Sequence, residues 1–222
     1  MTPSVVDMTP LQLLLMGGPV MVPIVMCSLL ALTIIIQKFN HFRSIDADIL
    51  IFRDRVLAQV RESNIKEAIL VCDTSGSWAA QVLKAGLVKF GGSRQEIVEA
   101  MEDAARFEVP KLEKGLAILS TIASVMPLLG LLGTVLGLCG AFHTIQVRAV
   151  AMNPVTPGDI VGGIWQALIT TAVSLMVAIP ALIAYNYFVN QVHIAVRDME
   201  QAASRMADLM TRVSDRDISD KE

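Results

Sequence analysis

The side chains that could take part in chemistry within the apolar parts of this chain are hydroxyls and one carboxamide. Thr134 lies in one apolar stretch, and Gln166, Thr170, Thr171 and Ser174 lie in the next. Hydroxyl and amide groups donate and accept hydrogen bonds, but they do not ionise near neutral pH. Their predicted role is therefore contact with polar groups or the ordering of water, rather than acid–base or nucleophilic catalysis.

On α-helices these residues form two polar arcs. With Thr134 at zero, Ser120, Ser124 and Thr121 fall at about 40°, 80° and 140° around the helix axis. The polar residues of the later stretch span a similar arc of about 140°. Single hydroxyls in apolar helices commonly bond to their own backbone. Two arcs together with an amide, which is costly to leave unpaired in hydrocarbon, favour a polar passage or a partner-binding surface.

Glycines form a separate strip on the earlier helix. Gly130, Gly133, Gly137 and Gly140 fall within about 80° of one another. Membrane helices associate by close backbone approach along such strips, because lipid offers no hydrophobic drive between helices. The sequence leaves open whether the strip packs against another helix of the same chain or against a neighbouring copy.

Three stretches without Asp, Glu, Lys or Arg must position these residues: 8–37, 115–147 and 160–196. Each is longer than the roughly 20 apolar residues that cross a bilayer. A hydrophobic fraction of 54%, a mean hydropathy of +0.57 and 5% aromatic residues are typical of a helical membrane protein. The sequence therefore predicts an all-α membrane protein with three transmembrane helices and long cytoplasmic helical extensions.

The placement of the basic residues predicts the topology. Of the 18 Lys and Arg residues, 17 lie in the segments 38–114 and 197–222. The positive-inside rule assigns both segments to the cytoplasm, which leaves the N-terminus outside and the C-terminus inside. We expect an N-terminus outside (1–18), transmembrane helix 1 (19–37), a cytoplasmic helical domain (38–115), transmembrane helix 2 (116–145), an outside loop (146–159), transmembrane helix 3 (160–189) and a cytoplasmic helix and tail (190–222); the family resemblance described below makes the outside segments periplasmic.

The segments between the spans are predicted to be helical. The first helix is expected to continue through 45–71, followed by a turn at 73–77 and a short helix over 78–90. Ser93, with a Glu three residues later, has the spacing of a capping box that opens a further helix. Pro110 predicts a kink or restart of that helix.

A heptad-like seam predicts that the last helix packs against helices of the same or a neighbouring subunit. Its apolar residues recur at alternating spacings of four and three. They are Val192, Val196, Met199, Ala203, Met206, Met210 and Val213.

The sequence shows no enzymatic signature. It has neither a nucleophile–base pair nor a nucleotide-binding glycine loop, and its cysteines and histidines lack metal-ligand spacing. We therefore expect no enzymatic activity, no cofactor, no metal and no nucleic-acid partner. The dispersed residues are His41, His143 and His193 with Cys27, Cys72 and Cys139.

Three motifs carry a resemblance to the ExbB, TolQ and MotA proton-channel family. Residues 119–137 (LSTIASVMPLLGLLGTVLG) resemble the second span of that family, and 166–186 (QALITTAVSLMVAIPALIAYN) resemble its third. The opening 17–32 (GGPVMVPIVMCSLLAL) is most similar to short ExbB proteins. MotA-type chains have four spans, so ExbB and TolQ fit better.

The resemblance implies a motor driven by the proton-motive force in the bacterial inner membrane. Members form a ring, usually a homopentamer, around the single-span helices of two ExbD-like partners, which supply the titrating Asp, and a TonB-like protein carries the work to the outer membrane. The pore threonines of the family correspond to Thr134 and Thr171. Several members have Glu where this chain has Gln166, so the direct relay role of that position is in doubt here.

Four other functions remain open at this stage. The same motor could serve TolQ-like envelope maintenance or gliding. The chain could be a self-sufficient channel or transporter, although it has no inverted repeat and no buried charge of its own. It could also be a passive scaffold in contact with membrane lipids, and an enzyme is the class that the residues support least.

Overall fold

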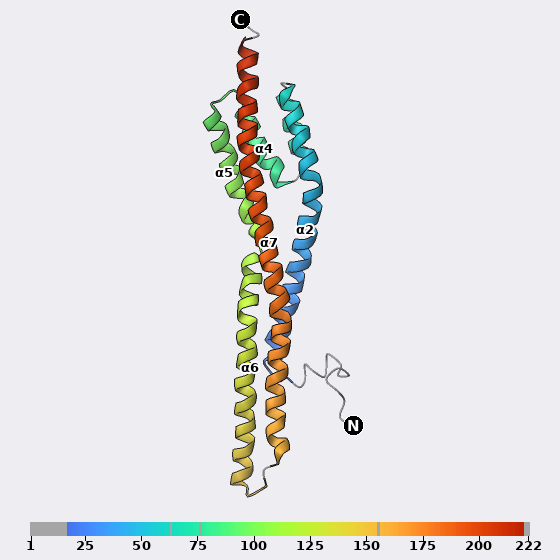
Figure 1. Ribbon diagram of the computed structural model, residues 1–222, viewed down its shortest axis with the longest axis vertical. Coiled ribbons are helices and arrows are strands. Elements are labelled where there is room, and N and C mark those ends of the chain that lie inside the picture. Colours follow the sequence, from blue (N-terminus) through green and yellow to red (C-terminus); the bar gives the residue numbers. More distant parts are fainter. Residues whose placement is uncertain (1–16, 63, 76, 155, 220–222) are drawn as a thin grey trace. The chain divides into compact units, whose positions relative to one another are not determined.

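The computed structural model describes residues 17–62, 64–75, 77–154 and 156–219, and every element in these residues is helical (Figure 1). The predicted all-α fold is therefore confirmed. The predicted periplasmic segment 1–18 lies outside the described residues except for its last two. The six helices are α2 (Met21–Arg61), α3 (Ile65–Thr74), α4 (Trp78–Val88), α5 (Arg94–Glu113), α6 (Leu116–Val150) and α7 (Pro157–Ser219).

Three of these helices are long and apolar enough to cross a membrane: the first part of α2 (Met21–Phe42), α6, and α7. Their hydropathy averages 2.0 to 2.2 over the most apolar windows, where at most two Asp, Glu, Lys or Arg residues occur. The chain divides into two compact units. The first combines residues 1–36 with 115–186 and holds the apolar segments, and the second combines 37–114 with 187–222.

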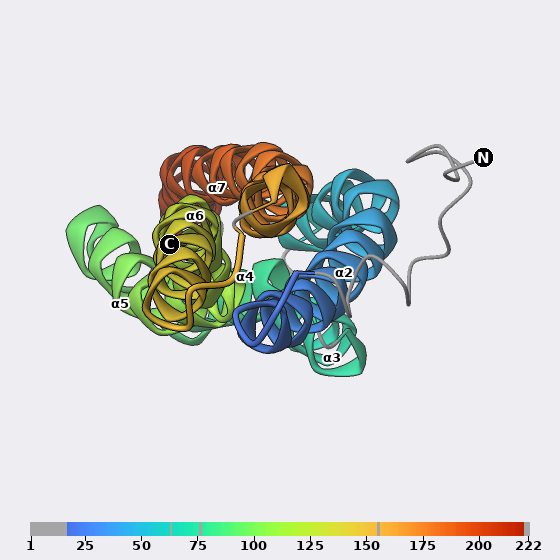
Figure 2. The ribbon, with the colours of Figure 1, turned by 90° about the horizontal axis from the view of Figure 1, so that it is seen from below.

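In the first unit, α6 and α7 pack along small residues and lie side by side (Figure 2). A Cβ on Gly130 would collide with Ser174, and one on Gly133 would collide with Thr170. A Cβ on Gly137 would come within 2.8 Å of the Gly163 carbonyl oxygen. These three glycines therefore bring the α6 and α7 backbones together within one chain, as close membrane-helix packing requires.

Gly140 differs from the other three glycines of the strip. A Cβ built there would have no neighbour within 4 Å, and the residue is exposed. The strip thus has two environments: an enclosed part that binds α7, and one outlying glycine that faces away from the rest of the chain.

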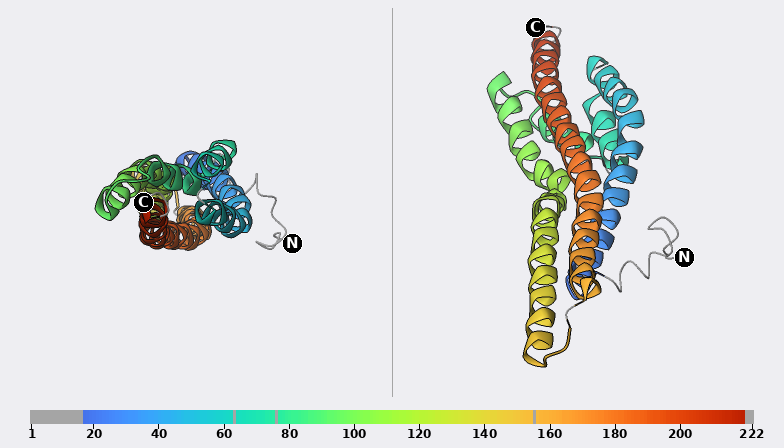
Figure 3. Two further views of the ribbon diagram at one scale, coloured as in Figure 1. Left: turned by 90° about the horizontal axis from the view of Figure 1, so that it is seen from above. Right: turned by 60° about the horizontal axis from the view of Figure 1, so that its bottom comes forward.

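The second unit is a small helical bundle with its own core (Figure 3). α4 packs against both α3 and α5. The apolar side chains that α2, α4, α5 and α7 contribute to this core are fully enclosed, which is the expected main source of its stability. They include Val56, Val60, Leu83, Leu87, Ile97, Met101, Met199, Met206 and Met210.

The seam on α7 is largely buried within its own chain. Val192, Met199, Ala203, Met206 and Met210 have at most 4% of their surface exposed. Polar contacts hold the outer end of the same interface, because the Arg94 side chain donates to Asp208 at 2.7 Å and to Ser204 at 3.2 Å.

The start of α5 confirms the predicted capping box. The Ser93 hydroxyl accepts from the backbone N–H of Glu96 at 3.3 Å, and the Glu96 carboxylate accepts from the backbone N–H of Ser93 at 2.9 Å. The predicted turn at 73–77 is also present, since α3 ends at Thr74 and Ser77 caps α4.

Two predicted boundaries differ from the structure. The first helix ends at Arg61 rather than continuing to residue 71, and Asn64 opens a separate helix. Pro110 lies inside α5, and the chain breaks instead at Gly115, which has a φ of +88°. α5 continues through Pro110 to Glu113, and the left-handed backbone conformation at residue 115 is one that glycine adopts without steric cost.

The connection between α6 and α7 is shorter than the predicted loop of 146–159. α6 continues to Val150, and α7 begins with Pro157. Proline is well suited to the first position of a helix, because its missing N–H would have no helical partner there.

Candidate functional site

Thr134 and Thr171 lie beside the contact between α6 and α7, and both are partly exposed. The Thr134 hydroxyl donates to the Leu131 carbonyl oxygen at 2.6 Å. The Thr171 hydroxyl lies 3.2 Å from the carbonyl oxygens of both Ala167, in its own helix, and Gly130, in α6. Each hydroxyl donates only one hydrogen and keeps free lone pairs, so each can still accept a hydrogen bond from water or from a protonated acid.

The two threonines lie on the same side of the α6–α7 pair. Thr134 is about 40° around α6 from Gly130, and Thr171 is about 60° around α7 from Ser174. Gly130 and Ser174 face each other at the interface. Since α6 and α7 run antiparallel, these two offsets turn toward the same face of the pair. The structure therefore brings the two family threonines onto one face.

Gln166 occupies the opposite flank of α7, about 140° from Thr171. Its amide nitrogen lies 3.5 Å from the carbonyl oxygen of Gly17, and a Cβ on Gly18 would collide with the amide. The start of the first membrane-spanning segment therefore lies against the Gln166 side of α7. The threonine face is left uncovered by this segment.

Thr170 and Ser174 are fully enclosed within the chain, with no exposed surface. The Thr170 hydroxyl lies 2.7 Å from the Gln166 carbonyl oxygen and 3.2 Å from that of Gly17. The Ser174 hydroxyl donates to the Thr171 carbonyl oxygen at 2.9 Å. Although the sequence grouped these side chains with Thr171 in one polar arc, the structure places them between helices, where they connect α7 to α6 and to the first span.

The site has hydrogen-bonding groups but no ionisable acid or base of its own. No Asp, Glu, Lys, Arg or His occurs in residues 116–142 or 160–192. Among the described residues, no group of three His, Cys, Asp or Glu side chains is placed to hold a metal ion. The face can therefore donate and accept hydrogen bonds, but it holds no carboxylate, amine or imidazole of its own.

Sequence reasoning missed one buried cation in the second unit. The Lys38 ammonium is 8% exposed and donates to the Leu112 carbonyl oxygen at 2.6 Å. α5 ends one residue later, and the last carbonyls of a helix have no helical donor. The sequence gave little indication of this contact. A lysine directly after an apolar span is commonly interpreted as the end of that span, not as a hydrogen-bond donor to the end of a distant helix.

Comparison with known proteins agrees with this architecture. Residues 74–201 match the model of the MotA/TolQ/ExbB proton channel family. The chain is 32% identical to the Tol-Pal system protein TolQ of Pseudomonas aeruginosa over 205 residues, which cover 85% of this chain and 87% of the relative. It is 33% identical to the putative biopolymer transport protein ExbB-like 3 of Synechocystis over 176 residues, 78% of this chain and 81% of the relative.

A third relative matches over a shorter region. The chain is 39% identical to the biopolymer transport protein ExbB of Xanthomonas campestris over 97 residues, 43% of this chain and 37% of that protein. Three apolar helices and these relatives define the class: this is a multipass, all-α membrane protein of the proton-channel type. The chain belongs to the MotA/TolQ/ExbB family, which confirms the resemblance seen in the motifs.

Proposed function

We propose that this protein is the ring-forming subunit of a motor in the bacterial inner membrane that the proton-motive force drives. Copies of the chain surround a single-span partner of the ExbD type, which carries the titrating carboxylate. The observation that supports this most strongly is the uncharged, hydroxyl-bearing face of the α6–α7 pair. Thr134 and Thr171 lie there, on the side away from the start of the first span.

The chemistry of this face suits a foreign acid. A carboxyl group in the middle of a membrane is costly unless hydrogen bonds and water surround it. The threonine hydroxyls can form hydrogen bonds with such a carboxyl group without taking up its proton. Because Thr170 and Ser174 are enclosed and Gln166 contacts Gly17, we assign the passage to Thr134 and Thr171 and give the other three a packing role.

The available energy is sufficient for such a motor. One elementary charge that crosses 100 mV releases about 2.3 kcal/mol. The energy that a few protons release per step therefore exceeds the roughly 1 kcal/mol that a typical hydrogen bond contributes in net terms. This energy can shift the contacts between a ring and its central helix.

The basic residues support an orientation with the second unit in the cytoplasm. Segments 38–114 and 197–222 contain 17 of the 18 Lys and Arg residues. By the positive-inside rule the α6–α7 connection at 151–156 then lies in the periplasm.

The proposed load is a TonB-like protein that powers active transport across the outer membrane, since relatives named as biopolymer transport proteins match the chain. A Tol-Pal load is the second candidate. The relative named TolQ matches 85% of this chain at 32% identity, which is similar to the ExbB-like match. Proteins that co-purify with the complex from native membranes distinguish the two: a TonB-like protein supports the first load, and Tol-Pal proteins support the second.

Proton flux into liposomes tests the proposal. The complex purified with its single-span partner should acidify the lumen of vesicles under an imposed potential, and the chain without the partner should not. Neutralising the partner's intramembrane acid should abolish the flux. Equal flux from the chain alone would instead identify a self-sufficient channel.

A further inference from the structure

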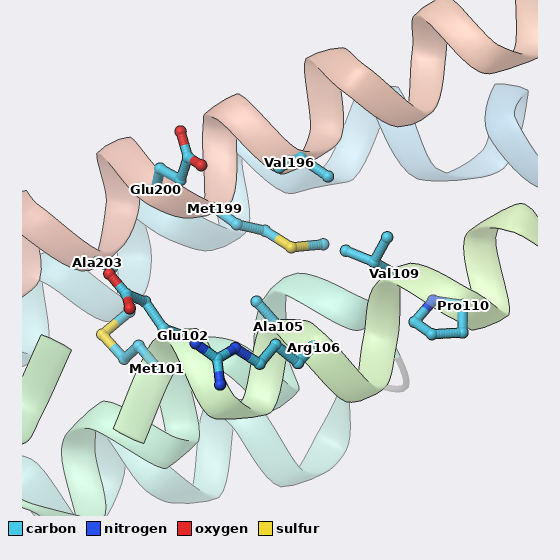
Figure 4. Close-up of a pocket in the computed structure, with 10 residues that line it drawn as sticks. All are labelled: Met101, Glu102, Ala105, Arg106, Val109, Pro110, Val196, Met199, Glu200 and Ala203. Carbon is cyan, nitrogen blue, oxygen red and sulfur yellow. The ribbon is translucent and has the colours of Figure 1, made fainter. Parts of the chain in front are cut away.

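Two features of the described residues lie outside the proposed proton path. One is an open groove between α5 and α7 in the second unit, where Met199 and Val109 point toward each other (Figure 4). Its lining is mainly apolar and does not identify an occupant. The other is the contact between Gln166 of α7 and the start of the first span, in which the donors and acceptors are defined.

The carbonyl oxygen of Gly17 depends on side chains of α7 for its hydrogen bonds. Gly17 is buried, and no backbone N–H of the described residues donates to this oxygen. The Gln166 amide nitrogen lies 3.5 Å from it and the Thr170 hydroxyl 3.2 Å. The Thr170 hydroxyl has a single hydrogen and lies closer, at 2.7 Å, to the backbone carbonyl oxygen of Gln166. The Gln166 amide is therefore the group that can serve Gly17 while Thr170 bonds within α7.

Gly18 leaves the space that this amide occupies. Its φ is +71°, a conformation that glycine adopts without steric cost. A Cβ on Gly18 would collide with the Gln166 amide nitrogen and lie 3.1 Å from the amide carbon. The Gly18 carbonyl oxygen in turn accepts from the backbone N–H of Met21 at 3.1 Å, where α2 begins. The amide thus packs directly against the turn from which the first span starts.

We infer that Gln166 is a positioning residue whose amide N–H clamps the Gly17–Gly18 turn to α7. The clamp fixes the start of the first span on the flank of α7 that lies away from Thr171. An ionised carboxylate of the same shape would present only acceptors to the Gly17 carbonyl oxygen. Two acceptors without a hydrogen between them are unfavourable in apolar surroundings, so the role requires a donor at this position.

The surroundings of the clamp make a pH test of this donor specific. Residues 17–36, 116–142 and 160–192 contain no Asp, Glu, Lys, Arg or His. Asp159, seven residues before Gln166, is the nearest charged residue along α7, and it is present in every variant. The tyrosines of α7 lie about five turns away or more. A pH effect that appears only when position 166 carries a carboxyl group therefore reports on that group.

Distances between two spin labels on the chain in lipid nanodiscs test the inference. The labels replace Val22, near the start of α2, and Val161, near the start of α7, which are 63% and 59% exposed. The native cysteines are replaced by alanine, and labelled chains are diluted with unlabelled ones so that both labels belong to one chain. Gln166→Met keeps the length of the side chain and removes the donor. Leu168→Met is the matched control, because Leu168 is exposed on the same helix.

We expect one narrow distance distribution for the chain with Gln166 and for Leu168→Met. In Gln166→Met the distribution should become at least about twofold broader, because the buried Gly17 carbonyl oxygen loses its donor. An unchanged distribution in Gln166→Met overturns the inference.

Gln166→Glu gives a readout that a general loss of packing would not produce. A protonated carboxyl group can donate to the Gly17 carbonyl oxygen, and an ionised one cannot. We expect a narrow distribution at low pH that broadens once infrared absorption shows the introduced carboxyl group to be ionised, whereas the chain with Gln166 stays narrow throughout. A distribution that remains narrow after ionisation, or is already broad before it, overturns the inference. If the carboxyl group stays protonated up to pH 9, the Gln166→Met result decides.

The clamp lies within one chain, and only its effect on proton flux rests on the proposed function. Gln166→Met in the complex with the single-span partner should lower the flux into liposomes at least about fivefold relative to Leu168→Met, because a released first span can move toward the threonine face. Broadened distances with unchanged flux overturn the positioning role and leave the proposed motor standing. Absence of flux from the wild-type complex overturns the proposed motor, and the spin-label distances then still decide whether the clamp exists.

Discussion

At the scale of single residues, the central feature is that two hydroxyls of similar type share one face of the α6–α7 pair. Replacing Thr134 or Thr171 with valine keeps the shape and removes the hydroxyl. We expect each variant to reduce proton flux roughly fivefold to tenfold, because a lost hydrogen bond to the passing acid or water costs about 1 kcal/mol or slightly more.

The flux assay in liposomes measures this effect, and native mass spectrometry verifies that the ring still assembles. Thr33→Val is the matched control, because the Thr33 hydroxyl is exposed on the first span and bonds to its own helix at Leu29. Equal losses in all three variants would show that the hydroxyls act through general stability rather than through the passage.

Cys72 provides a residue-scale prediction in the second unit. Burial, aided by the neighbouring Asp73 carboxylate, raises the pKa of the Cys72 thiol to about 11. The folded protein should therefore keep this thiol protonated at pH 8, where the thiolate is the reactive form. In a variant without Cys27 and Cys139, we expect maleimide to label Cys72 at least tenfold more slowly in the native protein than after denaturation. Equally rapid labelling would contradict the enclosed position.

The raised pKa of Cys72 also predicts how the free energy of unfolding changes with pH. The ordinary pKa of the thiol is 9.0, so between about pH 9 and 11 the folded state binds more protons than the unfolded state. The stabilisation from the buried thiol is fully present below that window and is lost as the pH rises through it. Relative to Cys72→Ala, the wild type should lose unfolding free energy between pH 8 and pH 10.5, as chemical denaturation would measure.

At the scale of the helices, the glycine strip explains how α6 and α7 approach each other. Gly137→Ala would place a Cβ 2.8 Å from the Gly163 carbonyl oxygen, and a backbone atom cannot move aside easily. We expect the change to destabilise the α6–α7 pair by about 1–3 kcal/mol, the usual cost of overpacking. Reversible unfolding in mixed detergent would measure it.

Gly140→Ala is the control for this prediction. Nothing lies within 4 Å of the new methyl group, so the stability of the single subunit should stay within about 0.5 kcal/mol of the wild type. If the two variants unfolded alike, helix propensity rather than the contact with α7 would explain the result.

The end of α5 depends on a contact from α2. In Lys38→Met the Leu112 carbonyl oxygen loses its donor at 2.6 Å, and an unsatisfied buried acceptor costs about 1–3 kcal/mol. Amide hydrogen exchange in residues 107–114 should accelerate about fivefold or more. Lys38→Arg retains a donor and should exchange much closer to the wild-type rate. Unchanged exchange in Lys38→Met would mean that water replaces the ammonium without cost.

The sequence predicted the helices well, because charge-free length and helical periodicity are local properties. The Ser93 capping box and the turn before Trp78 were found for the same reason. Periodicity could not show which neighbour each polar residue meets. Thr170 and Thr171 are adjacent in sequence, yet only Thr171 remains partly exposed. The difference arises because α6 and Gly17 cover Thr170.

At the scale of the whole molecule, one chain contains two units that differ in the residues they present. The first presents small and hydroxyl-bearing residues in apolar helices, and the second has an ordinary apolar core with charged outer faces. The proposed motor requires both kinds of surface, because its proton path must be polar without being charged, while the second unit, which the proposed orientation places in the cytoplasm, can use apolar burial. The family match spans parts of both units.

An electron cryomicroscopy map of the complex purified from native membranes with its partner tests the central claim most directly. The account predicts several copies of this chain around a central helix of a different polypeptide, with Thr134 and Thr171 on the inner wall at the level of that helix's acidic residue. A map in which both hydroxyls face lipid, and no foreign helix occupies the centre, would contradict it.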